Sequence, residues 1–293
     1  MKISEMLAKK RTISFEVFPP KQESGDMDRL QKTLLRVKEL KPDFISVTFG
    51  AMGNTRRDTA KIASFIKTIG VEPLAHITGG PCTPEDVDGT VSELLGGGVE
   101  NILALRGDKP VAYEAEYCKY FKHATDLMQY LHRFKESGRL DFGAACYPEG
   151  HIESNTLAED LRHMKEKQDA GADFFITQLF YDNNYYYRLV SEARRAGITA
   201  PIIPGIMPLV NPKSVKRITA MCGAAIPLDF RSMLEMYQDD ENLLHEIGLN
   251  FACYQIMDLI ARGAPGIHIY MMNNAQIAES IHSRLENVFG KLF

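Results

Sequence analysis

The sequence lacks the cysteine patterns that build metal sites and disulfide frameworks. Its five cysteines include no C-x-x-C pair, which argues against a zinc ribbon or a cysteine-ligated cluster within the chain. Their odd number argues against a disulfide framework, so we expect buried free thiols in a reducing compartment. The eight histidines show no metal-ligand spacing either, and no metal is predicted.

Targeting and membrane signals are also missing. No apolar signal-peptide core follows the charged N-terminus, and charges interrupt every apolar run before it reaches membrane-spanning length. The formal net charge is only −4 and no basic stripe is present. We therefore expect a cytoplasmic protein that binds neither nucleic acid nor a membrane.

General catalytic motifs are absent as well. The sequence contains no H-E-x-x-H, no P-loop, no G-x-G-x-x-G and no G-x-S-x-G. The glycine runs 79–80 and 96–98 have the wrong spacing for a dinucleotide fingerprint, so we predict turns there. The sequence therefore does not indicate which dinucleotide, if any, the protein binds.

What the sequence does contain is a regular alternation of strand and helix patterns. Short apolar runs that end at Gly, Pro or polar residues are each followed by an amphipathic segment, as in a parallel α/β sheet. The predicted strands are residues 12–18, 44–49, 73–77, 101–105, 142–146, 174–180, 202–206 and 267–271. Eight such units close a (β/α)8 TIM barrel, which we predict as one catalytic domain over residues 1–293. A doubly wound open sheet is the alternative.

Apolar stripes at helical spacing lie between these strands. They occupy residues 30–37, 62–69, 157–164, 243–260 and 277–289. Thr83-Pro84 begins another helix with a Thr cap and a proline in the first turn. The gap between the seventh and eighth strands is about twice the usual spacing, so we predict extra helices there.

Polar side chains stand at the ends of the predicted strands, where barrel proteins build their active sites. Arg106 and Asp108 follow the fourth strand directly, although an ion pair that ties a loop is the alternative. Glu16 lies between Phe15 and Val17 on the first strand. Apolar surroundings would raise the pKa of its carboxyl group and suit a general acid, whereas a structural ion pair is the alternative.

The segment after the fifth strand combines two rings with two charges. Tyr147 and His151 precede a helix on which Asp160 and Lys167, seven residues apart, share one face. Such a set can hold a large polar cofactor, with rings that stack, a lysine for phosphate and a carboxylate for ribose. An ordinary amphipathic helix with solvated charges is the alternative, and the residues alone favour it.

Several blocks resemble a known family. Residues 15–21, Phe-Glu-Val-Phe-Pro-Pro-Lys, resemble the F-E-x-F-P-P-[KR] opening of methylenetetrahydrofolate reductase. Later blocks resemble the family's motifs in the same order, at residues 47–51, 103–108, 147–151, 176–180 and 204–208. The resemblance covers nearly the whole chain and is to the short bacterial form, which consists of the catalytic barrel only.

This resemblance implies a flavoprotein that reduces 5,10-methylenetetrahydrofolate to 5-methyltetrahydrofolate. NADH or NADPH would first reduce FAD, after which folate takes the place of the nicotinamide. Glu16 matches the family's acid, and Asp108 matches a carboxylate near flavin and pterin. Thr48 matches a nicotinamide contact and Gln178 a residue shared by both substrates, and we add Tyr270 at the end of the eighth strand as a substrate contact.

The resemblance also implies a set of flavin contacts. They are Phe49, Ala51, His76, Arg106, Gly107, Asp108, Ala124, Tyr147, His151, Ser154, Asp160, His163 and Lys167. The chain departs from the family's pattern at His123, where Tyr is usual, and at Asn274, where an Arg often helps to hold the folate. Two further departures are Glu166, where a second base can occur, and Ile218, where one branch has an aromatic residue.

Two other functions remain open from the sequence. The first is a flavin subunit that takes electrons from an iron–sulfur partner instead of a nicotinamide. The second is a flavin-free barrel lyase that uses Glu16 and Asp108. We also expect a homo-oligomer, as is common for soluble enzymes.

Overall fold

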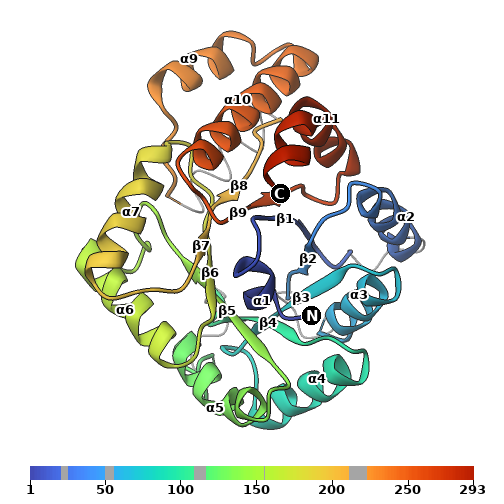
Figure 1. The fold of residues 1–293 in the computed structure, drawn as a ribbon, viewed down its shortest axis with the longest axis vertical. Helices are drawn as coiled ribbons and strands as arrows, with labels where there is room; N and C mark the ends of the chain where they lie inside the picture. The colour runs from blue at the N-terminus through green and yellow to red at the C-terminus, as the bar shows by residue number, and fades with distance from the viewer. Residues whose placement is uncertain (21–25, 50–55, 109–116, 155, 211–222) are drawn as a thin grey trace.

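The structure is a computed structural model that describes residues 1–20, 26–49, 56–108, 117–154, 156–210 and 223–293. Two predicted positions, Ala51 and Ile218, lie outside the described residues. The described part forms a ring of parallel strands with helices around it (Figure 1). This is the predicted barrel architecture.

Nine strands of the described chain form a single sheet, in the order β7-β6-β5-β4-β3-β2-β1-β9-β8. Their bounds are β1 Thr12–Val17, β2 Phe44–Val47, β3 Glu72–Thr78, β4 Asn101–Leu105, β5 Asp141–Cys146, β6 Phe174–Thr177, β7 Ile202–Ile203, β8 Gly205–Ile206 and β9 Gly266–Tyr270. All neighbouring strands in this sheet pair in parallel, as the alternation of strands and helices predicted.

The predicted seventh strand is divided in two at Pro204. Proline has no N–H to donate to a ladder, so the strand is interrupted there. The first half, β7, pairs with β6, whereas the second half, β8, pairs with β9. One interrupted segment therefore bridges the two ends of the sheet and closes the barrel.

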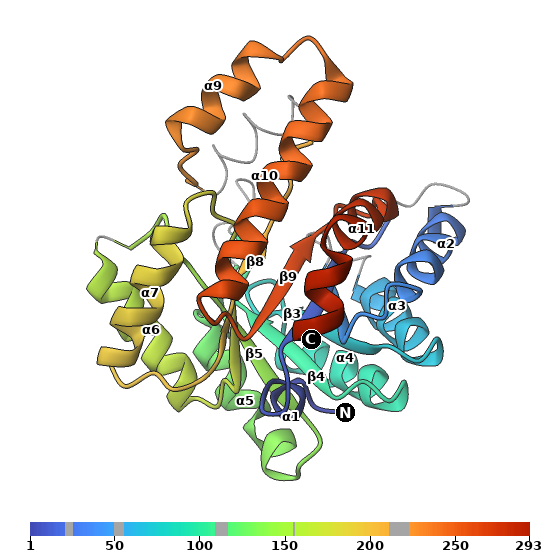
Figure 2. The same ribbon diagram turned by 45° about the horizontal axis from the view of Figure 1, so that its top comes forward.

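Helices surround the barrel, except α1, which lies within the ring of strands in Figure 1. Those described are α1 Ile3–Leu7, α2 Asp26–Lys38, α3 Arg56–Thr68, α4 Pro84–Gly96, α5 Ala124–Glu136, α6 Leu157–Asp169, α7 Asn183–Arg195, α9 Leu228–Met236, α10 Glu241–Ala261 and α11 Ala275–Leu292. The Thr83 cap is confirmed, because its side chain and that of Asp86 form a reciprocal capping box. The predicted insertion is also confirmed: α9 and α10 extend away from the barrel (Figure 2).

Side chains alternate along the strands between the helix layer and the barrel interior. Ile13, Phe15 and Val17 of β1 pack in the core shared with the helices. A separate apolar cluster fills the other face near the amino ends of the strands, and it consists of Ile3, Phe44, Leu74, Leu103, Phe174, Ile176 and Ile203. This apolar cluster occupies the interior on the amino side of the strands, and the cavity lies toward their carboxyl ends.

Helix α1 was not predicted, because five residues are too short to show a helical period. It contributes the fully buried Ile3 to the interior cluster. The Ile3 N–H donates to Asn101 Oδ1 at 2.9 Å, and the Ser4 N–H and hydroxyl donate to Asp141 at 2.9 and 2.8 Å. Polar residues at the starts of β4 and β5 thus hold α1 against the barrel.

Replacing Asn101 with Ala should lower the free energy of unfolding by about 1–3 kcal/mol, because the buried Ile3 N–H would lose its acceptor. The measurement is urea unfolding together with limited proteolysis between α1 and β1. Glu5→Ala, at an exposed position of the same helix, is the matched control and should leave both unchanged. Equal stability of the Asn101→Ala variant and the wild type would show that Asn101 does not anchor α1.

Candidate active site

A cavity of about 1720 Å³ is lined by residues at the carboxyl ends of the strands. Every described residue that the sequence predicted to contact cofactor or substrate lines this cavity. These residues are Glu16, Thr48, Phe49, His76, Arg106, Gly107, Asp108, Ala124, Tyr147, His151, Ser154, Asp160, His163, Lys167, Gln178 and Tyr270. The structure thus brings them to one place, while their individual roles stay predictions.

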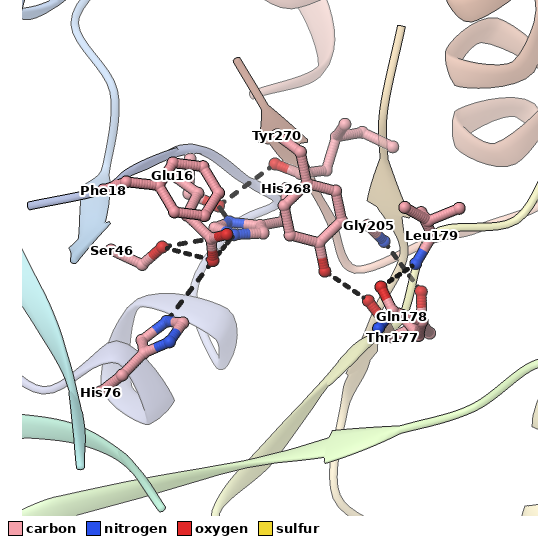
Figure 3. A network of polar contacts seen from close by, with 12 residues as sticks. Glu16, Phe18, Ser46, His76, Thr177, Gln178, Leu179, Gly205, His268 and Tyr270 are labelled. Carbon is pink, nitrogen blue, oxygen red and sulfur yellow. Dashed lines mark hydrogen bonds and ion pairs between the residues drawn. The ribbon is translucent and has the colours of Figure 1, made fainter. Parts of the chain in front are cut away.

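Glu16 lies inside the barrel and is only 6 % exposed. Ser46 Oγ donates to Glu16 Oε2 at 3.2 Å, and His268 Nε2 lies 3.5 Å from the same oxygen (Figure 3). His76 Nε2 is 3.4 Å away from it (Figure 3). The expectation of apolar surroundings was wrong, because the apolar neighbours of Glu16 along the strand point to the helices and its partners come from β2, β3 and β9.

The expected rise in the pKa of Glu16 is wrong for the same reason. Burial raises the pKa, but the hydrogen bond to His268, the nearby imidazoles and the Ser46 hydroxyl together lower it below the ordinary value. The protein therefore stabilises Glu16 as a carboxylate. Any proton that Glu16 passes to a ligand must come from a group that can supply it to this oxygen.

His268 contacts this oxygen through Nε2, and the sequence did not predict it as a site residue. Ser14 Oγ donates to the Ile267 carbonyl at 3.3 Å, so the hydroxyl accepts from His268 Nδ1, which lies 2.8 Å away. Nδ1 then carries a proton, and Nε2 faces Glu16.

A signal for His268 was present in the sequence. In the run Ile267-His268-Ile269-Tyr270, the two polar side chains alternate with isoleucines and therefore share one face of the strand. The structure confirms this, because the rings of His268 and Tyr270 meet edge to face with their centroids 5.2 Å apart.

His76 is buried beside the same carboxylate. Burial lowers its pKa to about 4, with Glu16 opposing the change and His268 adding to it. The imidazole is therefore neutral at neutral pH. Its Nε2 is within ion-pair range of Glu16, but the contact lacks hydrogen-bond geometry, and the buried nitrogen has no partner in the described structure. A polar group with unused hydrogen-bonding capacity thus faces the cavity.

Arg106 forms an ion pair, but its partner was not predicted. The guanidinium contacts the Glu153 carboxylate with both terminal nitrogens, at 2.5 and 3.0 Å, and its Nε donates to the Gly107 carbonyl at 3.1 Å. The pair ties the loop after β4 to the loop after β5. Asp108 is instead exposed at the cavity wall.

Asp160 and Lys167 share one face of α6, as their spacing predicted. The alternative of solvated charges is wrong for Asp160, which is only 5 % exposed. Its two oxygens accept from the His151 N–H at 3.0 Å and the Ser154 hydroxyl at 2.7 Å, so it fixes the loop after β5. Lys167 Nζ donates to the Ala145 carbonyl at 2.8 Å, and burial lowers its pKa.

The closing seam of the barrel positions Tyr270. Its hydroxyl donates to the Thr177 carbonyl at 2.7 Å, and Thr177 Oγ1 accepts from the Gly205 N–H at 2.9 Å (Figure 3). A Cβ on Gly205 would lie 2.5 Å from the Thr177 carbonyl oxygen and 2.6 Å from the Tyr270 ring. Only glycine leaves room for Tyr270 at this place.

Metal clusters and membrane-spanning helices can be assessed for the described residues. Within them, no group of three or more His, Cys, Asp or Glu side chains is arranged to hold a metal ion. None of the described helices is long and apolar enough to span a membrane.

The fold and the cavity define a barrel protein whose polar site lies at the carboxyl ends of its parallel strands, the usual position of a barrel active site. The chain belongs to the methylenetetrahydrofolate reductase family, whose sequence model matches residues 2–286. The 5,10-methylenetetrahydrofolate reductase of Escherichia coli is 35 % identical over 92 % of this chain and 88 % of its own length.

Other similar proteins are longer than this chain or share only its fold. A rice protein named "Probable methylenetetrahydrofolate reductase (NADH)" is 35 % identical over 96 % of this chain, which spans only 49 % of the rice protein. A Clostridium thermocellum structure, described as binding two copies of 5-methyl-5,6,7,8-tetrahydrofolic acid, matches with a TM-score of 0.69, 16 % identity and 99 % coverage of both chains. At that identity the likeness shows the fold alone.

The low pKa of His76 predicts a pH-dependent stability. Between its unfolded value of 6.5 and its folded value of about 4, the unfolded chain binds a proton at His76 that the native protein does not. Stability should therefore fall as the pH falls, by roughly 2 kcal/mol between about pH 7.5 and pH 5. Urea unfolding should show a smaller fall in His76→Gln. An equal fall in wild type and variant would mean that His76 is not held neutral.

Proposed function

We propose that this protein is an FAD-dependent reductase that converts 5,10-methylenetetrahydrofolate to 5-methyltetrahydrofolate. A nicotinamide dinucleotide reduces the flavin first, leaves, and is replaced in the same cavity by the folate. The observation that carries the proposal is the buried Glu16 carboxylate, which lines a large cavity and lies 3.5 Å from His268 Nε2 behind it. Family membership supplies the reaction.

The residues present fit FAD. A cavity of about 1720 Å³ exceeds an ordinary small-ligand pocket and has room for a dinucleotide with a second ligand beside it. Lys167 offers positive charge for a diphosphate, and Arg106, paired with Glu153, lines the same cavity. The Tyr147 and His151 rings, with centroids 4.6 Å apart, also line it. When bound, the flavin would accept and return a hydride.

The chain's own residues would handle the proton. Opening the five-membered ring of the folate requires protonation of its nitrogen. Glu16 would first take a proton from His268 Nε2 and then pass it to this nitrogen, because the lowered pKa of Glu16 keeps the resting carboxyl group ionised. The negative charge of Asp108 favours the iminium cation that ring opening produces.

The remaining cavity residues would orient the two substrates in turn. Thr48 and Gln178 lie on opposite sides of the site, after β2 and β6, and both line the cavity. Gln178 is held by its backbone N–H, which donates to the Cys146 carbonyl at 2.7 Å, and by its side-chain oxygen, which accepts from the Leu179 N–H at 2.9 Å. We propose NADH as the electron donor, following the name of the rice relative.

FAD should copurify with the protein, and Lys167→Ala should weaken its binding by about tenfold to a hundredfold, because a partly desolvated cation near the phosphates is lost. Fluorescence titration of the flavin-free protein measures the dissociation constant of FAD. Lys165→Ala is the matched control, since Lys165 lies on the same helix and pairs with Asp169 on its surface. A colourless protein that cannot be reconstituted with FAD would refute the proposed function.

Glu16→Gln should leave flavin binding and flavin reduction by NADH nearly unchanged. Folate reduction should fall by about a hundredfold or more, because only that half-reaction needs a protein acid. Anaerobic stopped-flow spectroscopy follows the two half-reactions separately. If both slow equally, Glu16 supports the architecture instead; if neither slows, the proton comes from another group.

A further inference from the structure

The strand that carries Glu16 continues past the end of its neighbour. The ladder between β1 and β9 ends with the pair Glu16–Tyr270. The chain after β9 then turns away, with Met272 and Asn273 both in the left-handed region at φ +53° and +57°. Backbone pairing with β9 therefore cannot hold Phe18, two residues beyond Glu16.

The Asn273 side chain makes these hydrogen bonds instead. The Phe18 N–H donates to Asn273 Oδ1 at 2.8 Å, and Asn273 Nδ2 donates to the Phe18 carbonyl at 2.9 Å. The primary amide thus offers one acceptor and one donor to a single residue, as a neighbouring strand would. On the other edge of β1, the Thr48 N–H donates to the Val17 carbonyl at 3.0 Å.

The residue type suits both demands of this position. Asparagine tolerates the left-handed conformation better than most residues with a side chain. Its amide has the donor and the acceptor that the Phe18 peptide needs, whereas aspartate would place a carboxylate against the Phe18 carbonyl. Asn273 is therefore fitted to this contact as well as to the turn.

We propose that Asn273 is a positioning residue for the proton-donating pair. It lies on the connection that follows His268, and it holds the strand that carries Glu16. Since Glu16 and Phe18 are two residues apart and both line the cavity, fixing Phe18 also fixes the place of Glu16 relative to His268. This proposal rests on the proposed function of Glu16.

The decisive comparison is Asn273→Gly against Met272→Gly. Both positions have left-handed backbone and neighbour each other, so glycine adds the same flexibility, but only the first change removes the amide. In the FAD-loaded protein, Asn273→Gly should slow the folate half-reaction by about tenfold to a hundredfold and leave flavin reduction by NADH unchanged. Met272→Gly should leave both unchanged.

A second readout needs neither turnover nor folate. Nuclear magnetic resonance of histidine-labelled protein should show altered His268 ring shifts and an altered pH titration in Asn273→Gly, but wild-type behaviour in Met272→Gly. Asn273→Asp, which keeps the turn but loses the Nδ2 donor, should reproduce both effects of Asn273→Gly. It keeps the test available if the glycine variant does not fold.

Equal folate rates and equal His268 spectra in the two glycine variants would overturn the proposal. Equal slowing of both half-reactions in Asn273→Gly would also overturn it, because the role would then be structural. Glu16→Gln, measured in parallel, separates the proposed role of Glu16 from the proposed role of Asn273. If it leaves folate reduction intact, the proposed role of Glu16 fails, whereas the His268 spectra still decide whether Asn273 positions the pair.

Discussion

The contact between Glu16 and His268 is the interaction on which the site depends. A carboxylate inside a barrel loses its water, and this cost must be offset by hydrogen bonds and a partner that can carry positive charge. His268 Nε2 supplies that partner from the adjacent strand, Ser46 supplies a donor, and Ser14 fixes the tautomer. The lowered pKa of Glu16 is the result of this arrangement.

The rest of the barrel keeps that contact in place. The apolar cluster with Ile3 packs in the interior on the amino side of the strands, and the polar side chains of the site lie toward the carboxyl ends. At the seam, Pro204 interrupts one strand, and Tyr270 reaches over Gly205 to the Thr177 carbonyl. The break thus leaves room for the Tyr270 ring. This ring meets the His268 ring edge to face and lines the cavity.

Local patterns in the sequence predicted most of the architecture. Periodicity and turn residues located the strands and the helices between them. Strand ends located part of the residues that line the cavity, and the family resemblance supplied the others. Two features were not predicted because they depend on short segments. Helix α1 has only five residues, and the interruption at Pro204 divides an apolar run that the sequence predicted as one strand.

The electrostatics of the site could not be predicted from neighbours along the chain. Phe15 and Val17 suggested an apolar setting for Glu16, yet its partner His268 lies 252 residues away in the sequence. Likewise, Arg106 pairs with Glu153 rather than Asp108, because the loops after β4 and β5 meet in space. The alternation of side chains along a strand predicts which residues face the barrel interior. Only the register between strands shows which of these residues contact one another.

The most direct test of the central claim is an anaerobic spectral titration of the wild-type protein. NADH should bleach the visible absorbance of bound flavin, and 5,10-methylenetetrahydrofolate added afterwards should restore it, with one 5-methyltetrahydrofolate formed per flavin reoxidised. A flavin that NADH bleaches but that this folate does not reoxidise would contradict the account. So would a protein that binds no flavin.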